Sequence, residues 1–72
     1  MATVMKPVFS SHVSEVGFDD ETNELIVAWK NGRVSAYAGA TVELADQLSR
    51  APSVGNMLQT DVKGVLPHRY IK

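Results

Sequence analysis

Ser53 and Gly55 lie at the junction between two predicted helices, where the chain is suited to binding an anion. A serine that caps a helix leaves backbone N–H groups pointing outward, and such groups bind phosphate oxygens. Glycine in a helical turn costs about 1 kcal/mol relative to alanine, and close approach of a ligand would explain it. Packing of the helix against a sheet is the alternative explanation. We expect a small anionic ligand here, such as a nucleotide.

Four further side chains could complete such a site. Arg69 belongs to a C-terminal segment that could fold back toward Ser53, and Arg33 lies beside a predicted turn. Tyr37 could stack on a nucleobase, and His68 could add a hydrogen bond or a π surface. The alternative is structural, with the aromatic rings packed at the edge of the core and the arginines solvated.

Ser10, Ser11 and His12 place hydroxyl groups beside an imidazole. Adjacent residues of a strand face opposite sides, so a serine nucleophile and a histidine base would not meet easily there. We favour a hydroxyl-rich turn before the first strand, with both serines as further candidates for ligand binding. The sequence has no metal-ligand spacing and no phosphate-binding loop motif, so it predicts a non-enzymatic protein without metal or cofactor.

These candidate residues must be positioned by a small sheet, and Asn31-Gly32 gives the strongest indication of its hairpin. Asn-Gly between alternating hydrophobic residues is typical of a two-residue hairpin turn. The resulting register pairs apolar residues on one face: Trp29 with Val34, Val27 with Ala36, and Leu25 with Ala38. It places Trp29 in the core and Tyr37 on the opposite, mixed face.

The rest of the chain predicts an α+β fold. A polar turn over residues 20–23 would place Phe18 opposite Leu25, which gives a three-stranded antiparallel meander over residues 13–18, 24–30 and 33–38. Thr41 is expected to begin a helix that ends near residue 50. Pro52 interrupts it, and a second short helix follows over residues 53–62. Residues 65–71 are expected to be extended, as a docked tail or a short edge strand.

Size and charge limit the function. The 72 residues form a single domain over 1–72, small enough that self-association into a homo-oligomer would help its core. Without an apolar run that could span a bilayer or a signal peptide, we expect a cytoplasmic protein with no membrane contact. The net charge of −1 argues against binding long nucleic acid. The first 46 residues carry three basic and seven acidic residues, a net of −4, whereas residues 47–72 carry four and one, a net of +3.

The chain resembles the KTSC domain, a small domain found at the C-terminus of some lysyl-tRNA synthetases and as a free-standing protein in bacteria and phages. The resemblance covers residues 8–71. It rests on the order and spacing of five segments: Val8-Phe9-Ser10-Ser11, Val16-Gly17-Phe18-Asp19, Leu25-Ile26-Val27-Ala28-Trp29, Asn31-Gly32 and Ala51-Pro52-Ser53-Val54-Gly55. The family has been suspected of binding RNA, so the resemblance implies an RNA- or tRNA-associating domain as a second hypothesis.

Two departures from the family pattern weigh against RNA. The Tyr-x-Tyr of the family is here Ser35-Ala36-Tyr37, and its aromatic pair after Ser-x-Gly is replaced at Asn56-Met57-Leu58. Both changes remove rings on which bases would stack. The leading hypothesis is therefore a binding module for a small phosphate-bearing ligand, in a phage setting one that sequesters a nucleotide signal. A protein–protein module that inhibits or assembles a host complex, with Trp29 as an exposed anchor, is the third hypothesis.

Overall fold

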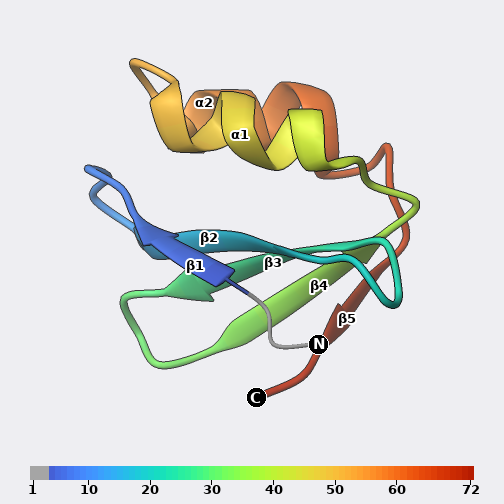
Figure 1. The fold of residues 1–72 in the computed structure, drawn as a ribbon. Coiled ribbons are helices and arrows are strands. Elements are labelled where there is room, and N and C mark those ends of the chain that lie inside the picture. Colours follow the sequence, from blue (N-terminus) through green and yellow to red (C-terminus); the bar gives the residue numbers. More distant parts are fainter. Residues whose placement is uncertain (1–3) are drawn as a thin grey trace.

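The computed structural model describes residues 4–72, without the side chains of Val4 and Asp61, and has two layers (Figure 1). One layer is an antiparallel sheet in the order β1-β2-β3-β4-β5. The elements follow the chain as β1 (Val4–Pro7), β2 (Val13–Asp19), β3 (Glu24–Trp29), β4 (Val34–Ala38), α1 (Val42–Arg50), α2 (Val54–Met57), a π-helical turn η1 (Leu58–Val62) and β5 (His68–Tyr70). The helices cover one side of the sheet, here called the helix face, and leave the outer face without a helix (Figure 1).

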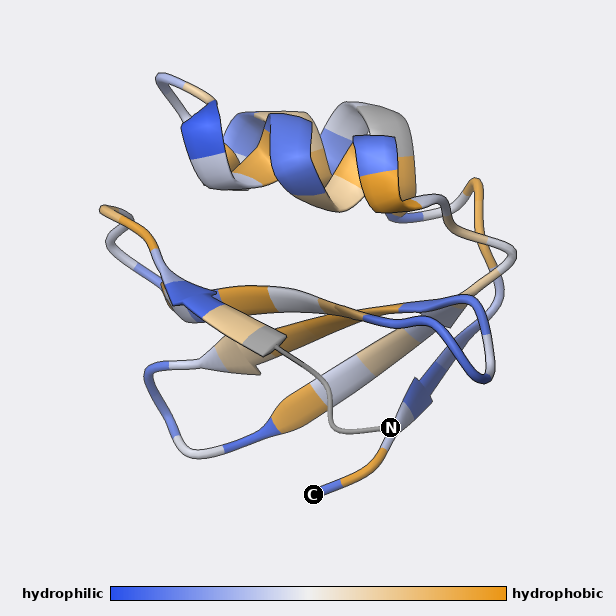
Figure 2. Cartoon of the chain, viewed as in Figure 1, coloured by the Kyte–Doolittle hydropathy of each residue, from blue (hydrophilic) through white to orange (hydrophobic). Residues whose placement is uncertain are grey.

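The core lies between the helix face and the helices. Its fully buried apolar side chains come from β2, β3, α1, α2 and η1, and are Val13, Val16, Leu25, Val27, Leu48, Val54, Leu58 and Val62. Figure 2 shows apolar residues on the strands below the helices and hydrophilic residues in the β2–β3 and β3–β4 turns. The predicted α+β class is confirmed, with β1 as an additional strand and β5 as the expected edge strand.

Local signals explain the helices. Thr41 caps α1, since its hydroxyl accepts a hydrogen bond from the Leu44 N–H at 3.2 Å. Ser53 caps α2 in the same way, accepting from the Asn56 N–H at 3.4 Å. The second predicted helix is divided into α2 and η1, which ends where the Lys63 N–H donates to the Leu58 carbonyl at 2.7 Å. Within the described part of the chain, no helix is long and apolar enough to cross a membrane.

The β2–β3 register agrees with the sequence. Phe18 lies opposite Leu25, and Val16 lies opposite Val27, as the polar turn predicts. An irregularity between Val13 and Glu15 shifts the pairing by one residue, which keeps Val13 in the core.

The predicted β3–β4 register is wrong by one residue. Leu25 lies opposite Tyr37 rather than Ala38. The turn has three residues instead of two: the Trp29 carbonyl accepts from the Gly32 N–H at 3.1 Å, and the Trp29 N–H donates to the Arg33 carbonyl at 2.8 Å. Gly32 adopts a φ of 91°, the left-handed conformation that closes a three-residue hairpin loop.

The one-residue shift exchanges the two faces of β4. Tyr37, predicted on a partly solvated face, lies on the helix face and is only 3% exposed. Ser35 joins it there, while Ala36 turns to the outer face, where it pairs with Ile26 on β3 and Arg69 on β5. The exchange decides which side chains of β4 lie on the helix face.

Candidate functional site

An open cleft of about 410 Å³ lies on the helix face, where the chain after η1 passes over β3, β4 and β5. Most of its lining residues are aromatic, basic or polar. They are Trp29, Asn31, Arg33, Ser35, Tyr37, Lys63, Gly64, His68 and Tyr70. The volume falls within the range of small-ligand pockets.

Strand pairing brings this set together. Arg33, Ser35 and Tyr37 alternate along β4 and its turn, so they share the helix face. β5 pairs antiparallel with β4 and places Tyr70 beside Ser35 and His68 beside Tyr37. The cleft therefore combines residues that are distant in the sequence.

The Ser35 hydroxyl is the polar centre of the cleft floor, and it is only 1% exposed. The indole N–H of Trp29 donates to Ser35 Oγ at 2.7 Å. Ser35 Oγ also lies 3.0 Å from His68 Nε2, to which it can donate its own proton. One hydroxyl thus fixes the orientation of two rings, one from β3 and one from β5.

Three rings line the β4–β5 side. The Tyr37 and His68 ring centroids are 5.0 Å apart, and the His68 and Tyr70 rings meet edge to face at 4.6 Å. Burial raises the pKa of the Tyr37 hydroxyl, and the neighbouring Tyr70 adds to this effect. Tyr37 therefore keeps its proton at neutral pH, whereas Tyr70 is 57% exposed and presents its ring to solvent.

Two cations complete the cleft. The Arg33 guanidinium carbon lies 5.1 Å from the Tyr70 ring centroid, and Lys63 Nζ lies 5.0 Å from the Trp29 ring centroid. Such distances are typical of cation–π contacts. Among the described residues that line the cleft there is no acidic side chain. The cleft therefore offers flat rings with positive charge beside them.

The π-helical turn positions Lys63. After its N–H binds the Leu58 carbonyl, Lys63 leaves helical geometry with φ −65° and ψ 128°. Gly64 follows with a φ of 78°, which directs the chain toward β5. The end of η1 thus places a cation over the ring of Trp29.

The structure brings together Arg33, Tyr37 and His68 among the predicted site residues. Ser53 and Gly55 do not line this cleft. Ser53 is exposed and acts as the cap of α2, and a Cβ atom added at Gly55 would meet nothing within 4 Å. The capping function assigned to Ser53 is confirmed, and its predicted contact with a ligand remains a prediction.

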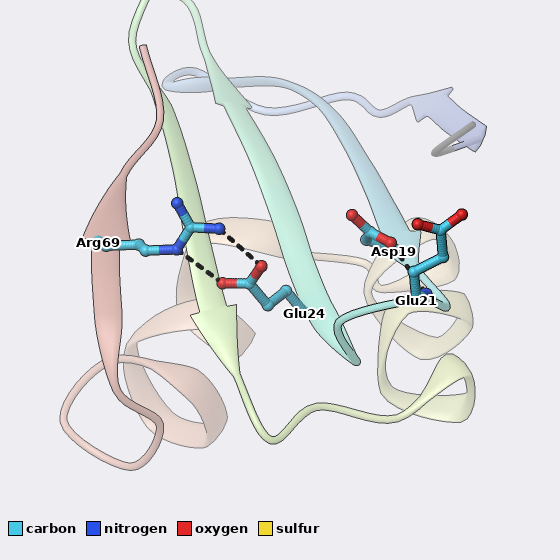
Figure 3. Close-up of polar contacts among 4 residues, drawn as sticks. All are labelled: Asp19, Glu21, Glu24 and Arg69. Atoms are coloured by element: carbon cyan, nitrogen blue, oxygen red, sulfur yellow. Dashed lines mark hydrogen bonds and ion pairs between the residues drawn. The ribbon is translucent and has the colours of Figure 1, made fainter. Parts of the chain in front are cut away.

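Arg69 lies on the outer face and does not line the cleft. Figure 3 shows its guanidinium directed at Glu24. Its guanidinium makes two hydrogen bonds to the Glu24 carboxylate, at 3.0 and 2.8 Å. Hydrogen bonding to Arg69 lowers the pKa of Glu24, Thr22 contributes in the same direction, and burial opposes both. Glu24 raises the pKa of Arg69 in turn. The predicted return of Arg69 toward Ser53 is therefore replaced by pairing with Glu24.

Ser10 and Ser11 form the turn between β1 and β2. Ser10 Oγ accepts from the N–H groups of His12 and Val13, both at 3.3 Å, so the predicted hydroxyl-rich turn is confirmed. Ser11 Oγ lies 3.0 Å from His12 Nδ1. The expectation that these two groups would not meet is wrong, because both belong to the turn rather than to a strand.

Six lining residues of the cleft were not among the predicted site residues: Trp29, Asn31, Ser35, Lys63, Gly64 and Tyr70. Trp29, predicted in the core, is partly buried and packs against the core while it lines the cleft. The predicted two-residue turn placed Ser35 on the face opposite Trp29. Lys63 was considered only as part of the basic C-terminal segment. A three-residue hairpin loop would have placed Ser35 and Trp29 on one face.

The comparisons with known proteins concern the whole domain. A family model described as the KTSC domain matches residues 9–65. The fold is similar to a crystal structure of a KTSC domain protein from Yersinia pestis, with a TM-score of 0.88 and 24% sequence identity, covering 99% of this chain and 100% of that chain. At 24% sequence identity, this similarity shows that the two proteins share a fold. The curated proteins give no match.

Proposed function

The chain belongs to the KTSC domain family, and on that premise we propose that it is a non-enzymatic binding module for a small, flat anion such as a nucleotide. The observation that carries the proposal is the pairing of cations with rings in one cleft, Arg33 with Tyr70 and Lys63 with Trp29. Rings stack on nucleobases, and cations bind phosphate oxygens.

The composition of the cleft supports a ligand with both properties. An apolar ligand would leave Arg33 and Lys63 without a counter-charge, and a simple anion would leave the rings without a stacking partner. The Ser35 hydroxyl already holds Trp29 and His68 in place, so part of the ordering of the site precedes binding. This arrangement suits a nucleotide whose base lies over the aromatic floor and whose phosphate lies near a cation.

Trp29 provides the measurement, because it is the one tryptophan of the chain and lies in the cleft. We expect nucleotides to change its fluorescence and to raise the melting temperature through binding to the folded state. Nucleosides and inorganic phosphate should each bind more weakly than the nucleotide. No change in fluorescence or melting temperature at millimolar nucleotide would contradict the proposal.

Two variants locate the site. Lys63→Ala should weaken binding of the nucleotide more than binding of the nucleoside, because it removes a phosphate contact and leaves most of the rings. Arg50→Ala is the matched control: it removes the same charge from the end of α1, outside the cleft. Equal losses in the two variants would indicate nonspecific attraction of the anion.

A second candidate function is weak association with single-stranded RNA. It is favoured by the exposed Tyr70 ring at the open sheet edge and by the net positive charge of residues 47–72. This function predicts affinity that falls steeply with salt and increases with RNA length. Affinity for a mononucleotide equal to that for a longer RNA favours the first proposal.

A further inference from the structure

β5 supplies two lining residues of the cleft, His68 and Tyr70, but its side chains bury little apolar surface. All three of its residues are exposed, and among the strands of residues 4–72 it pairs with β4 alone. Backbone hydrogen bonds flank it, from the Ala38 N–H to the Pro67 carbonyl and from the Val34 N–H to the Lys72 carbonyl, both at 2.9 Å. A short edge strand of this kind is expected to open easily.

The Glu24–Arg69 pair adds a connection that the ladder cannot make. Glu24 lies on β3 and Arg69 on β5, so their two hydrogen bonds cross β4 on the outer face (Figure 3). Ala36 is the β4 residue that pairs with Arg69. Asp19, at the end of β2, adds negative charge that favours the Arg69 cation. The pair thus links β3 to β5, two strands that are separated by β4 in the sheet.

The low exposure of Glu24 strengthens this connection. Glu24 is only 6% exposed, so its carboxylate has little access to water. Charge-assisted hydrogen bonds that are shielded from water are stronger than the same bonds in solvent. Displacement of β5 would remove Arg69 from Glu24, and the free energy of that loss opposes any displacement of the strand.

Alternation along β5 transmits the effect to the other face. His68 and Tyr70 flank Arg69 and point to the helix face, where they line the cleft. We infer that the Glu24–Arg69 pair is a positioning device, which sets His68 and Tyr70 for ligand binding from the opposite side of the sheet. The inference rests on the proposed function, but the positions of the two rings can be measured without a ligand.

The first test is NMR of the folded protein, with Glu24→Gln as the main variant. We expect the ring resonances of His68 and Tyr70 to shift or broaden. The Trp29 indole N–H resonance should also shift, because the Ser35 hydroxyl contacts both His68 and Trp29. A purely structural role would lower the melting temperature and leave these folded-state resonances unchanged. Lys6→Ala is the control, since it breaks an exposed ion pair with Asp46 at 3.8 Å. It should leave the cleft resonances in place.

The second test is nucleotide affinity. Glu24→Gln should weaken binding by about tenfold, within the usual range of coupling between two sites. Arg69→Lys keeps the charge and loses the double hydrogen bond, so it should give a smaller change in the same resonances. This second variant tests the inference even if the Glu24→Gln protein does not fold. Unchanged His68 and Tyr70 resonances in a folded Glu24→Gln or Arg69→Lys protein would overturn the inference. Absence of nucleotide binding in the unmodified protein would overturn only the proposed function.

Discussion

The two faces of the β4–β5 strand pair differ in every property that matters for binding. The helix face holds the rings and cations of the cleft around the Ser35 hydroxyl. The outer face holds Ala36 and one ion pair between Glu24 and Arg69. Both faces contain an arginine, but only Arg33 is free of a carboxylate partner among the hydrogen bonds and ion pairs described for this region.

This difference shows that exposure of a charged residue is a poor guide to its function. Arg69 has a side chain that is 58% exposed, yet its guanidinium is occupied by a buried carboxylate. Arg33 contacts an aromatic ring, which leaves its hydrogen-bond donors available to an anion. The partner of each arginine is decided by the strand register, because the register assigns the face.

The largest expected effect comes from breaking the helix face at Tyr37. Tyr37→Ala should lower the free energy of unfolding by about 3–5 kcal/mol, as for other buried aromatic residues, because the side chain lies in the core. Urea denaturation measures the loss, and Tyr37→Phe is the matched control, with a much smaller effect. A small loss for Tyr37→Ala would instead support the two-residue turn, in which Tyr37 is partly solvated.

A smaller effect is expected from Ser35→Ala, which removes the polar centre of the cleft. The Trp29 indole N–H loses its acceptor, and leaving this partly buried donor unsatisfied should cost about 1 kcal/mol, the low end for a buried group. Trp29 fluorescence and its indole N–H resonance should both change. Ser14→Ala, at an exposed position of β2 outside the cleft, is the matched control that should leave both signals unaltered; a change there would show that the two signals do not report on the Ser35 contact.

The sequence could predict much of the fold because its signals are local. Thr41 and Ser53 cap helices through bonds to residues three positions away, and the polar turn before β3 gives the correct register. Asn31-Gly32 misled because Asn-Gly suits two kinds of loop: a two-residue turn, or a three-residue turn that ends on a left-handed glycine. One residue of loop length decides which face Tyr37 occupies.

The site was less predictable because it depends on contacts between distant segments. Arg33, Tyr37 and His68 could be singled out by residue type, but only the docking of β5 brings them together. Glu24 and Arg69 are 45 residues apart, and no local pattern connects them. Likewise, the path of η1 places Lys63 over Trp29, and a helical pattern alone does not reveal a π-helical end.

Acid should weaken the Glu24–Arg69 pair of the outer face. The pKa of Glu24 is lowered in the folded protein, mainly by Arg69, relative to 4.5 in the unfolded chain. The stabilisation is therefore fully present above about pH 4.5 and is lost as the pH falls through the lower folded value. Melting temperatures measured from neutral to acidic pH should fall less steeply for Glu24→Gln than for the unmodified protein. Parallel curves would show that Glu24 titrates alike in both states.

The smallest effect is expected at the opposite edge of the sheet, where Lys6 pairs with Asp46 of α1. The two side chains are 59% and 40% exposed and 3.8 Å apart, so water screens the pair, in contrast to the buried carboxylate of Glu24. Lys6→Ala should change the free energy of unfolding by no more than about 0.5 kcal/mol. Asp46 also keeps its contact with Arg50 at 3.3 Å, which further reduces the loss. If Lys6→Ala destabilised the fold as much as Glu24→Gln does at neutral pH, burial could not be the reason that the outer-face pair matters, and the coupling of Arg69 to the cleft would need another cause.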